Sequence, residues 1–242
     1  MRVQVPPSAH RQDNMRTVLE AVLFFAKMNQ FRLTKPRHLT MREWYCVLIS
    51  SYFTAGRRGE TSRIIERGIR RDRVQGRMFS ELFLHLSLLL GFPAMLEGLT
   101  ILRAIASKST AASVKAESVA LVMKRGKDVL KRIYGSTLNR LLANLGSLHD
   151  DVPEMIVRDV YGRIISRRGL SLREREIVNV AVLAIQQLDQ QLYSHIRGAL
   201  ALHVSKKSLR TVISLAARIA HTDPEISLNL LSSLAESRKS IR

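Results

Sequence analysis

Apolar residues recur three and four positions apart along most of the chain, and the pattern is clearest over residues 170–200. In the first half of this stretch they form one helical face, made by Ile177, Val180, Ala181, Ala184 and Leu188. In the second half, Gln191, His195 and Ala199 follow one another at steps of four and share a face. The stretch therefore predicts two antiparallel helices joined by a tight connection at 187–189.

Helix-start and helix-stop residues divide the rest of the chain into further helices. Thr40 with Glu43, and Ser171 with Glu174, have the spacing of capping boxes. Together with glycine and proline stops, the pattern predicts helices over 14–28, 40–55, 61–71, 78–91, 94–107, 113–133, 152–166, 206–221 and 224–237. No segment has the alternating pattern of a strand, so the expected fold class is all-α.

The chain also contains an internal repeat, which appears when residues 39–50 are laid over residues 170–181. The matched pairs are Leu39 with Leu170, Arg42 with Arg173 and Glu43 with Glu174. We therefore expect a tandem repeat of one helical unit. Its predicted parts are an N-terminal arm and helix at 1–38, a first copy at 39–107, linker helices at 108–168 and a second copy at 169–242.

The two copies differ where polar chemistry would be. Tyr45 takes the place of Glu176, and Ile64 or Ile65 takes the place of His195. Apolar and aromatic groups fill an equivalent cavity instead of opening it. Only the second copy is therefore expected to hold a polar pocket, with His195 near a cavity where the copies or two subunits meet.

The composition excludes several classes of protein. With one cysteine, Cys46, among 242 residues, the chain can form neither an intramolecular disulfide nor a cysteine-based zinc site. A reducing, cytoplasmic location fits this best. The chain shows no signal-peptide pattern, and the apolar run at 82–92 is too short to span a membrane. We expect that run to be a buried helix and expect no membrane partner.

Basic residues far outnumber acidic ones and give a formal net charge of +19. Such a charge predicts attraction to polyanions, anionic lipid or a small anionic substrate, although a solvated basic surface is the favoured interpretation of the charge by itself. The chain has no nucleic-acid-binding motif and no glycine-rich phosphate loop. Nucleic acid is therefore an unfavoured partner.

The polar side chains of the predicted hairpin are the best candidates for a site. Glu176 is the candidate to orient His195, which would act as a proton donor; the alternative is a structural histidine between helices. Candidates to bind substrate oxygens or carboxylates are Asn179, Gln191, Arg173 and Arg197. Their alternatives are interface hydrogen bonds and surface ion pairs, with Arg173 next to Glu174 or Glu176. The sequence predicts no metal site and no cofactor.

The order of these motifs resembles the carboxymuconolactone decarboxylase family, which has the alkylhydroperoxidase-D-like fold. The resemblance rests on LSLREREIVNVAVLAIQQLDQQLYSHIRGAL at 170–200, followed by HVSKKSLRTVI at 203–213. The run LFLHLSLLLGFPAMLEGL at 82–99 and the tripeptide IYG at 133–135 support it. The resemblance implies an all-α fold, a two-copy chain and a homo-oligomer such as a dimer, trimer or hexamer.

In the redox-active branch of this fold, a Cys-x-x-Cys pair lies between a glutamate and a histidine. The glutamate and histidine map onto Glu176 and His195, whereas the cysteine positions hold Leu188 and Gln191. Peroxide reduction by a dithiol needs both thiols. The resemblance therefore implies the decarboxylase-like branch: a cofactor-free decarboxylase or related lyase that acts on an anionic lactone or keto acid, with His195 as proton donor. The alternatives are an alkylhydroperoxidase-like, peroxiredoxin-type antioxidant activity and a non-catalytic oligomeric binding protein.

Overall fold

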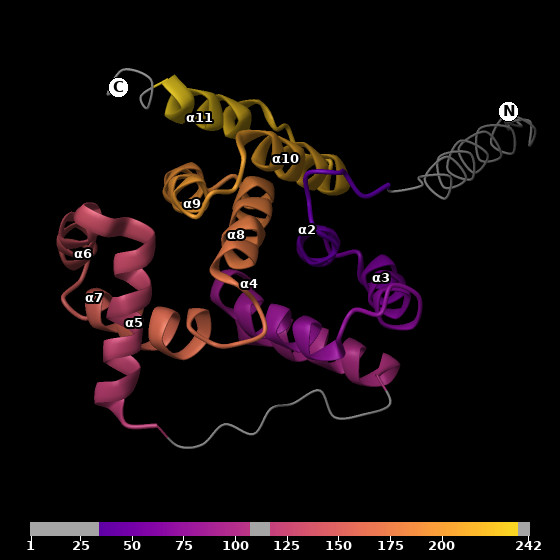
Figure 1. Ribbon diagram of the computed structural model, residues 1–242, viewed down its shortest axis with the longest axis horizontal. Helices are drawn as coiled ribbons and strands as arrows, with labels where there is room; N and C mark the ends of the chain where they lie inside the picture. Colours follow the sequence, from indigo (N-terminus) through magenta and orange to yellow (C-terminus); the bar gives the residue numbers. More distant parts are fainter. Residues whose placement is uncertain (1–33, 107–116, 237–242) are drawn as a thin grey trace, which may run out of the picture. The chain divides into compact units, whose positions relative to one another are not determined.

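A computed structural model describes residues 34–106 and 117–236, and every regular element in these ranges is helical (Figure 1). The elements are α2 (Met41–Thr54), α3 (Arg58–Arg70), α4 (Gly76–Ile105), α5 (Val119–Tyr134), the 3₁₀ turn η1 (Gly135–Thr137), α6 (Leu138–Gly146), α7 (Val152–Met155), the π-helix η2 (Ile156–Ile165), α8 (Leu172–Gln186), α9 (Asp189–Ala201), α10 (Lys206–Ala220) and α11 (Glu225–Glu236). The predicted all-α class is therefore confirmed.

The chain divides into a unit of residues 1–36 and a unit of residues 37–242, and the second unit contains all of these helices. The helix expected over 14–28 lies outside the described residues. The helix expected over 113–133 is described from Val119, where the Ser118 hydroxyl accepts a hydrogen bond from the Leu121 amide and so caps α5. The segment expected as one helix over 152–166 consists of α7 followed by η2.

Helix α8 is the central helix of the second unit, and its residues from Glu174 to Ala184 are all buried. It packs against α2, α9 and α10, which surround it in Figure 1. Gln187 ends α8 in the left-handed conformation, and α9 begins two residues later, as the tight connection predicted. The expected antiparallel arrangement is wrong, however. Figure 1 shows α8 lengthwise and α9 end-on, so the two helices cross.

Helix α4 contains the apolar run 82–92 and has two straight parts. Gly91 adopts a φ of 81° inside it, a conformation that suits glycine, and Pro93 follows. Leu82, Phe83 and Leu86 of the first part are buried, whereas Phe92 after the kink is 70% exposed. Among the described helices, α4 is the one that is long and apolar enough to cross a membrane, a property that core helices share.

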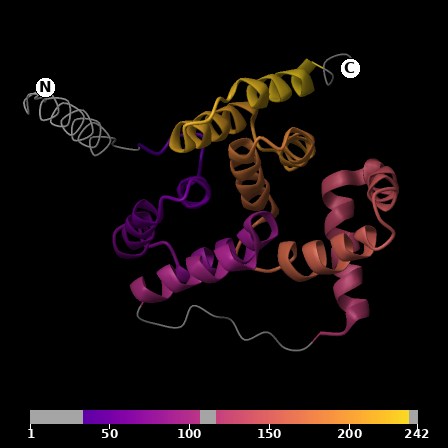
Figure 2. The same cartoon turned by 180° about the vertical axis from the view of Figure 1, so that it is seen from behind.

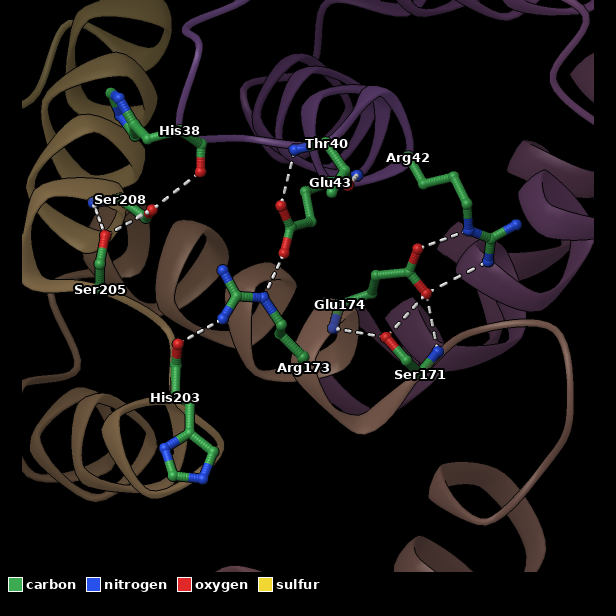
Figure 3. A network of polar contacts seen from close by, with 10 residues as sticks. All are labelled: His38, Thr40, Arg42, Glu43, Ser171, Arg173, Glu174, His203, Ser205 and Ser208. Atoms are coloured by element: carbon green, nitrogen blue, oxygen red, sulfur yellow. Dashed lines mark hydrogen bonds and ion pairs between the residues drawn. The ribbon is translucent and has the colours of Figure 1, made fainter.

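The starts of α2 and α8 are held together by two reciprocal ion pairs (Figure 3). Arg42 of α2 pairs with Glu174 of α8 at 2.6 Å, and Arg173 of α8 pairs with Glu43 of α2 at 2.5 Å. Each glutamate also completes the capping box of its own helix. This symmetry is what two copies packed about a pseudo-twofold axis would produce, although the tandem repeat itself stays a prediction. It also corrects the expected place of Arg173, which does not pair with Glu174 or Glu176.

Helices α5 and η2 form a second packed group, seen from behind on the right of Figure 2. Their backbones approach so closely that a β-carbon at Gly126 would lie 2.0 Å from the Val157 carbonyl oxygen. A β-carbon at Gly162 would lie 2.5 Å from the Val122 carbonyl oxygen. This close packing fixes the C-terminal end of α5, with Tyr134, next to α9.

Candidate functional site

Glu176 and His195 meet between α8 and α9, as the sequence predicts. The Nδ1 atom of His195 lies 2.8 Å from Oε2 of Glu176. Glu176 is buried, with 1% of its side chain exposed, whereas the His195 side chain is 19% exposed. A buried carboxylate therefore holds one ring nitrogen of His195, and part of the imidazole remains accessible.

Two further side chains extend this pair into the core. The amide nitrogen of Asn179 lies 3.1 Å from Nδ1 of His195, and its amide oxygen lies 2.8 Å from Nε2 of His85. Asn179 is 2% exposed and His85, on α4, is completely buried. The result is a continuous polar chain from His85 through Asn179 and His195 to Glu176.

His85 is neutral at physiological pH. Its burial, and next the nearby positive charge of Arg175, lower its pKa from 6.5 to about 3. A neutral imidazole has one nitrogen that donates and one that accepts. The nitrogen of His85 that carries the proton therefore decides which way the amide of Asn179 is turned.

The charge of Glu176 selects that orientation. An ionised carboxylate only accepts, so His195 must carry a proton on Nδ1 to donate to it. The same N–H can also be shared with the amide oxygen of Asn179, but not with its NH₂ group. A half-turn of the amide exchanges the two atoms at the same positions. Asn179 then donates to Nε2 of His85 and accepts from His195, which leaves Nε2 of His195 free for chemistry.

Two tyrosines lie beside the carboxylate of Glu176. The hydroxyl groups of Tyr134 and Tyr161 are 3.1 Å apart. Burial, and secondarily the charge of Glu176, raises the pKa of Tyr134 to about 12, while Arg197 opposes this rise. Gly198 completes the enclosure, because a β-carbon there would lie 3.2 Å from Cδ of Glu176. The carboxylate thus sits under the backbone of α9 and next to a protonated phenol.

A cavity of about 710 Å³ opens next to this group, between the α5–η1–α6 segment and α9. Its lining includes Tyr134, Ser194, Arg197 and Gly198. His195 does not line it, although the preceding residue Ser194 and Gly198, three residues further on, both do. A cavity at the junction of the two copies or of two subunits stays a prediction, since this cavity lies between the linker helices and α9.

The first copy has no such polar group at the matching position. Tyr45, which takes the place of Glu176, is buried, stacks edge-on against Phe79 and donates to Oδ2 of Asp72 at 2.5 Å. Ile65 is fully buried. Gly68 lies against both rings, since a β-carbon there would be 2.7 Å from Phe79 and 2.9 Å from Tyr45. Aromatic packing fills this region, as the sequence predicts.

The other predicted residues have separate positions. Gln191 is exposed on α9 and joins no hydrogen bond of the Glu176 network within the described residues. Arg197 is exposed at the cavity, with its guanidinium 6.0 Å from the ring centroid of Tyr193. His85 was missed as a site residue, because a single histidine in an apolar run is typical of a core position. No pattern along the chain connects it to Asn179.

A family model and one curated relative point to the same family. A model of the carboxymuconolactone decarboxylase family matches residues 155–228, which contain Glu176, Asn179 and His195. The 4-carboxymuconolactone decarboxylase of Acinetobacter baylyi is 32% identical over 91 residues, or 37% of this chain and 68% of that protein. Peroxisomal protein 2 of Schizosaccharomyces pombe is 28% identical over 98 residues, or 40% of this chain and 46% of that protein. The match thus spans less than half of the yeast relative.

Proposed function

This chain belongs to the carboxymuconolactone decarboxylase family, and on that premise we propose that it is a cofactor-free decarboxylase or related lyase for an anionic lactone or keto acid. One observation carries the proposal: the 2.8 Å contact between Nδ1 of His195 and Oε2 of the buried Glu176. A partly exposed imidazole backed by a buried carboxylate is suited to transfer a proton at its free nitrogen.

The proposed reaction has two steps. The bond to the carboxylate carbon of the substrate breaks, carbon dioxide leaves, and the bonding electron pair is delocalised into a conjugated carbonyl. His195, in its protonated form, then gives the proton on Nε2 to the substrate carbon, and Glu176 stabilises the imidazolium before the transfer. Asn179 and the neutral His85 keep the imidazole in the required orientation.

Arg197 is the best placed of the predicted binding residues to hold a substrate carboxylate, because it lines the cavity next to Gly198. Gln191, on the same face of α9 as His195, is a second candidate. The exposed Phe92 and Leu96 on the second part of α4 give a reason to propose a homo-oligomer, in which another copy covers them. A cytoplasmic location remains part of this proposal.

The test is release of carbon dioxide from carboxymuconolactone by the purified protein. We expect His195→Gln and Glu176→Gln to reduce turnover by a factor of about 10²–10⁴, the usual contribution of a positioned acid. His149→Gln is the matched control, since His149 is exposed on the surface. Equal activity of the intact protein and His195→Gln would refute the role of the histidine, and absence of turnover in the intact protein would exclude this substrate.

A thiol-based antioxidant mechanism finds no support in the geometry. Cys46, the one cysteine of the sequence, is fully buried, and burial raises the pKa of its thiol. Peroxide-dependent thiol oxidation that is lost in Cys46→Ser would revive this alternative.

A further inference from the structure

We propose that the cavity between the α5–η1–α6 segment and α9 binds a small organic polyanion, either a phosphate ester or a polycarboxylate. This site lies beside the Glu176–His195 pair and shares Arg197 with the proposed substrate site, but anion binding there can be measured without the proposed reaction.

Three arginines from three helices line this cavity. Arg132 comes from the end of α5, Arg140 from α6 and Arg197 from α9. No acidic side chain is found among its described lining residues. Three guanidinium groups around one cavity repel each other, and an anion between them removes that repulsion while accepting their hydrogen bonds.

What these three arginines share is one cavity that holds no acidic partner for them. Several arginines elsewhere pair with carboxylates, for example Arg125 with Glu117 at 2.6 Å and Arg167 with Glu81 at 2.7 Å, whereas the exposed Arg103 and Arg210 have no such pair among the described residues and line no cavity with other arginines. Within the described part of the chain, Arg132, Arg140 and Arg197 have no ion pair with an acidic side chain. Their donors remain available to a ligand.

The remaining lining matches an oxygen-rich ligand of moderate size. The polar residues Ser136, Thr137 and Asn144 line the same cavity as the arginines. Its volume of about 710 Å³ lies within the range of small-molecule sites. A diphosphate or a tricarboxylate presents several oxygens that can meet donors from more than one side.

The cavity is also close to the buried pair. Gly198 lines the cavity and also packs against Glu176. The charges of Glu176 and Arg197 both shift the pKa of Tyr134, in opposite directions. A bound anion would therefore occupy the side of α9 that adjoins the carboxylate without contacting it directly.

The experiment is isothermal titration calorimetry of the full chain with pyrophosphate and, separately, with citrate, at constant low ionic strength. We expect saturable binding of at least one of them at one site per chain. Arg132→Gln, Arg140→Gln and Arg197→Gln should each weaken binding about tenfold or more, as expected when a charge-assisted hydrogen bond is lost. Tighter binding of pyrophosphate assigns a phosphate ester, and tighter binding of citrate assigns a polycarboxylate.

The matched controls are Arg103→Gln and Arg210→Gln, since both arginines are exposed and neither lines the cavity. They should change the affinity less than twofold. The proposal is overturned if neither anion binds at low salt, or if the control variants weaken binding as much as the cavity variants. All variants are exposed surface changes, and far-ultraviolet circular dichroism verifies that they fold. Loss of carbon dioxide release with intact anion binding would contradict the proposed function alone.

Discussion

The buried neutral state of His85 predicts a specific loss of stability in acid. Its pKa is lowered from 6.5 to about 3 in the folded protein, with burial as the main cause. Between about pH 3 and pH 6.5, His85 is protonated in the unfolded chain and neutral in the folded chain. His85 therefore leaves the free energy of unfolding unchanged above pH 6.5, and it lowers that free energy progressively as the pH falls from 6.5 towards 3.

The size of the effect follows from the difference in pKa. At pH 4.5 the pH lies two units below the unfolded value, and each unit corresponds to about 1.36 kcal/mol, so His85 should cost about 2–3 kcal/mol. In His85→Gln this cost is absent. The difference in the free energy of unfolding between the intact protein and His85→Gln should therefore shift by about 2–3 kcal/mol between pH 7.5 and pH 4.5.

Urea unfolding followed by tryptophan fluorescence measures this difference, because Trp44 is the one tryptophan and is buried in α2. Carboxylates that titrate in the same pH range change the stability of both proteins equally, so their effect cancels in the difference between the two. His149→Gln, at an exposed position, is the control for the removal of a histidine. If the difference for His85→Gln is independent of pH, His85 is not held neutral and the described proton arrangement is wrong. A histidine resonance that stays neutral down to about pH 4 would support it independently.

Two further predictions concern packing and the reciprocal ion pairs. A β-carbon at Gly68 would lie 2.7 Å from Phe79, so Gly68→Ala should lower the free energy of unfolding by about 1–2 kcal/mol in urea unfolding. At Gly198 the nearest atom would lie at 3.1 Å, and Gly198→Ala should be near neutral because alanine favours a helix. The opposite ranking of the two variants would refute this reasoning. Arg42→Ala and Arg173→Ala should each lower the free energy of unfolding by about 1–2 kcal/mol, since each leaves a buried carboxylate short of a partner, and the absence of any loss would count against the pairs.

Local signals were sufficient to predict the helices around the site. The capping boxes at Thr40 and Ser171 define helix starts through bonds within three residues, and both are present. The meeting of Glu176 with His195 was also predictable, because the connection between their helices is only two residues long. The crossing of α8 and α9 was not, since a short loop brings two helices together without fixing their angle.

Features that depend on distant residues could not be predicted in this way. The pairing of Arg173 with Glu43 joins helices 130 positions apart, and a nearby glutamate in the sequence was the simpler partner. His85 and Asn179 are 94 positions apart and meet only after α4 packs against α8. The arginines of the cavity come from α5, α6 and α9, and no spacing along the chain brings them together.

The position of His85 on α4 has a consequence for any attempt to shorten the protein. The family match begins at residue 155, so a fragment cut to it would retain Glu176, Asn179 and His195 but lose α2 and α4. Asn179 would then face solvent instead of a buried imidazole, and the face of α8 that packs on α2 would be exposed. The two halves of the chain are therefore suited to a split design, in which separately expressed pieces recover the complete hydrogen-bonded relay only when they reassemble.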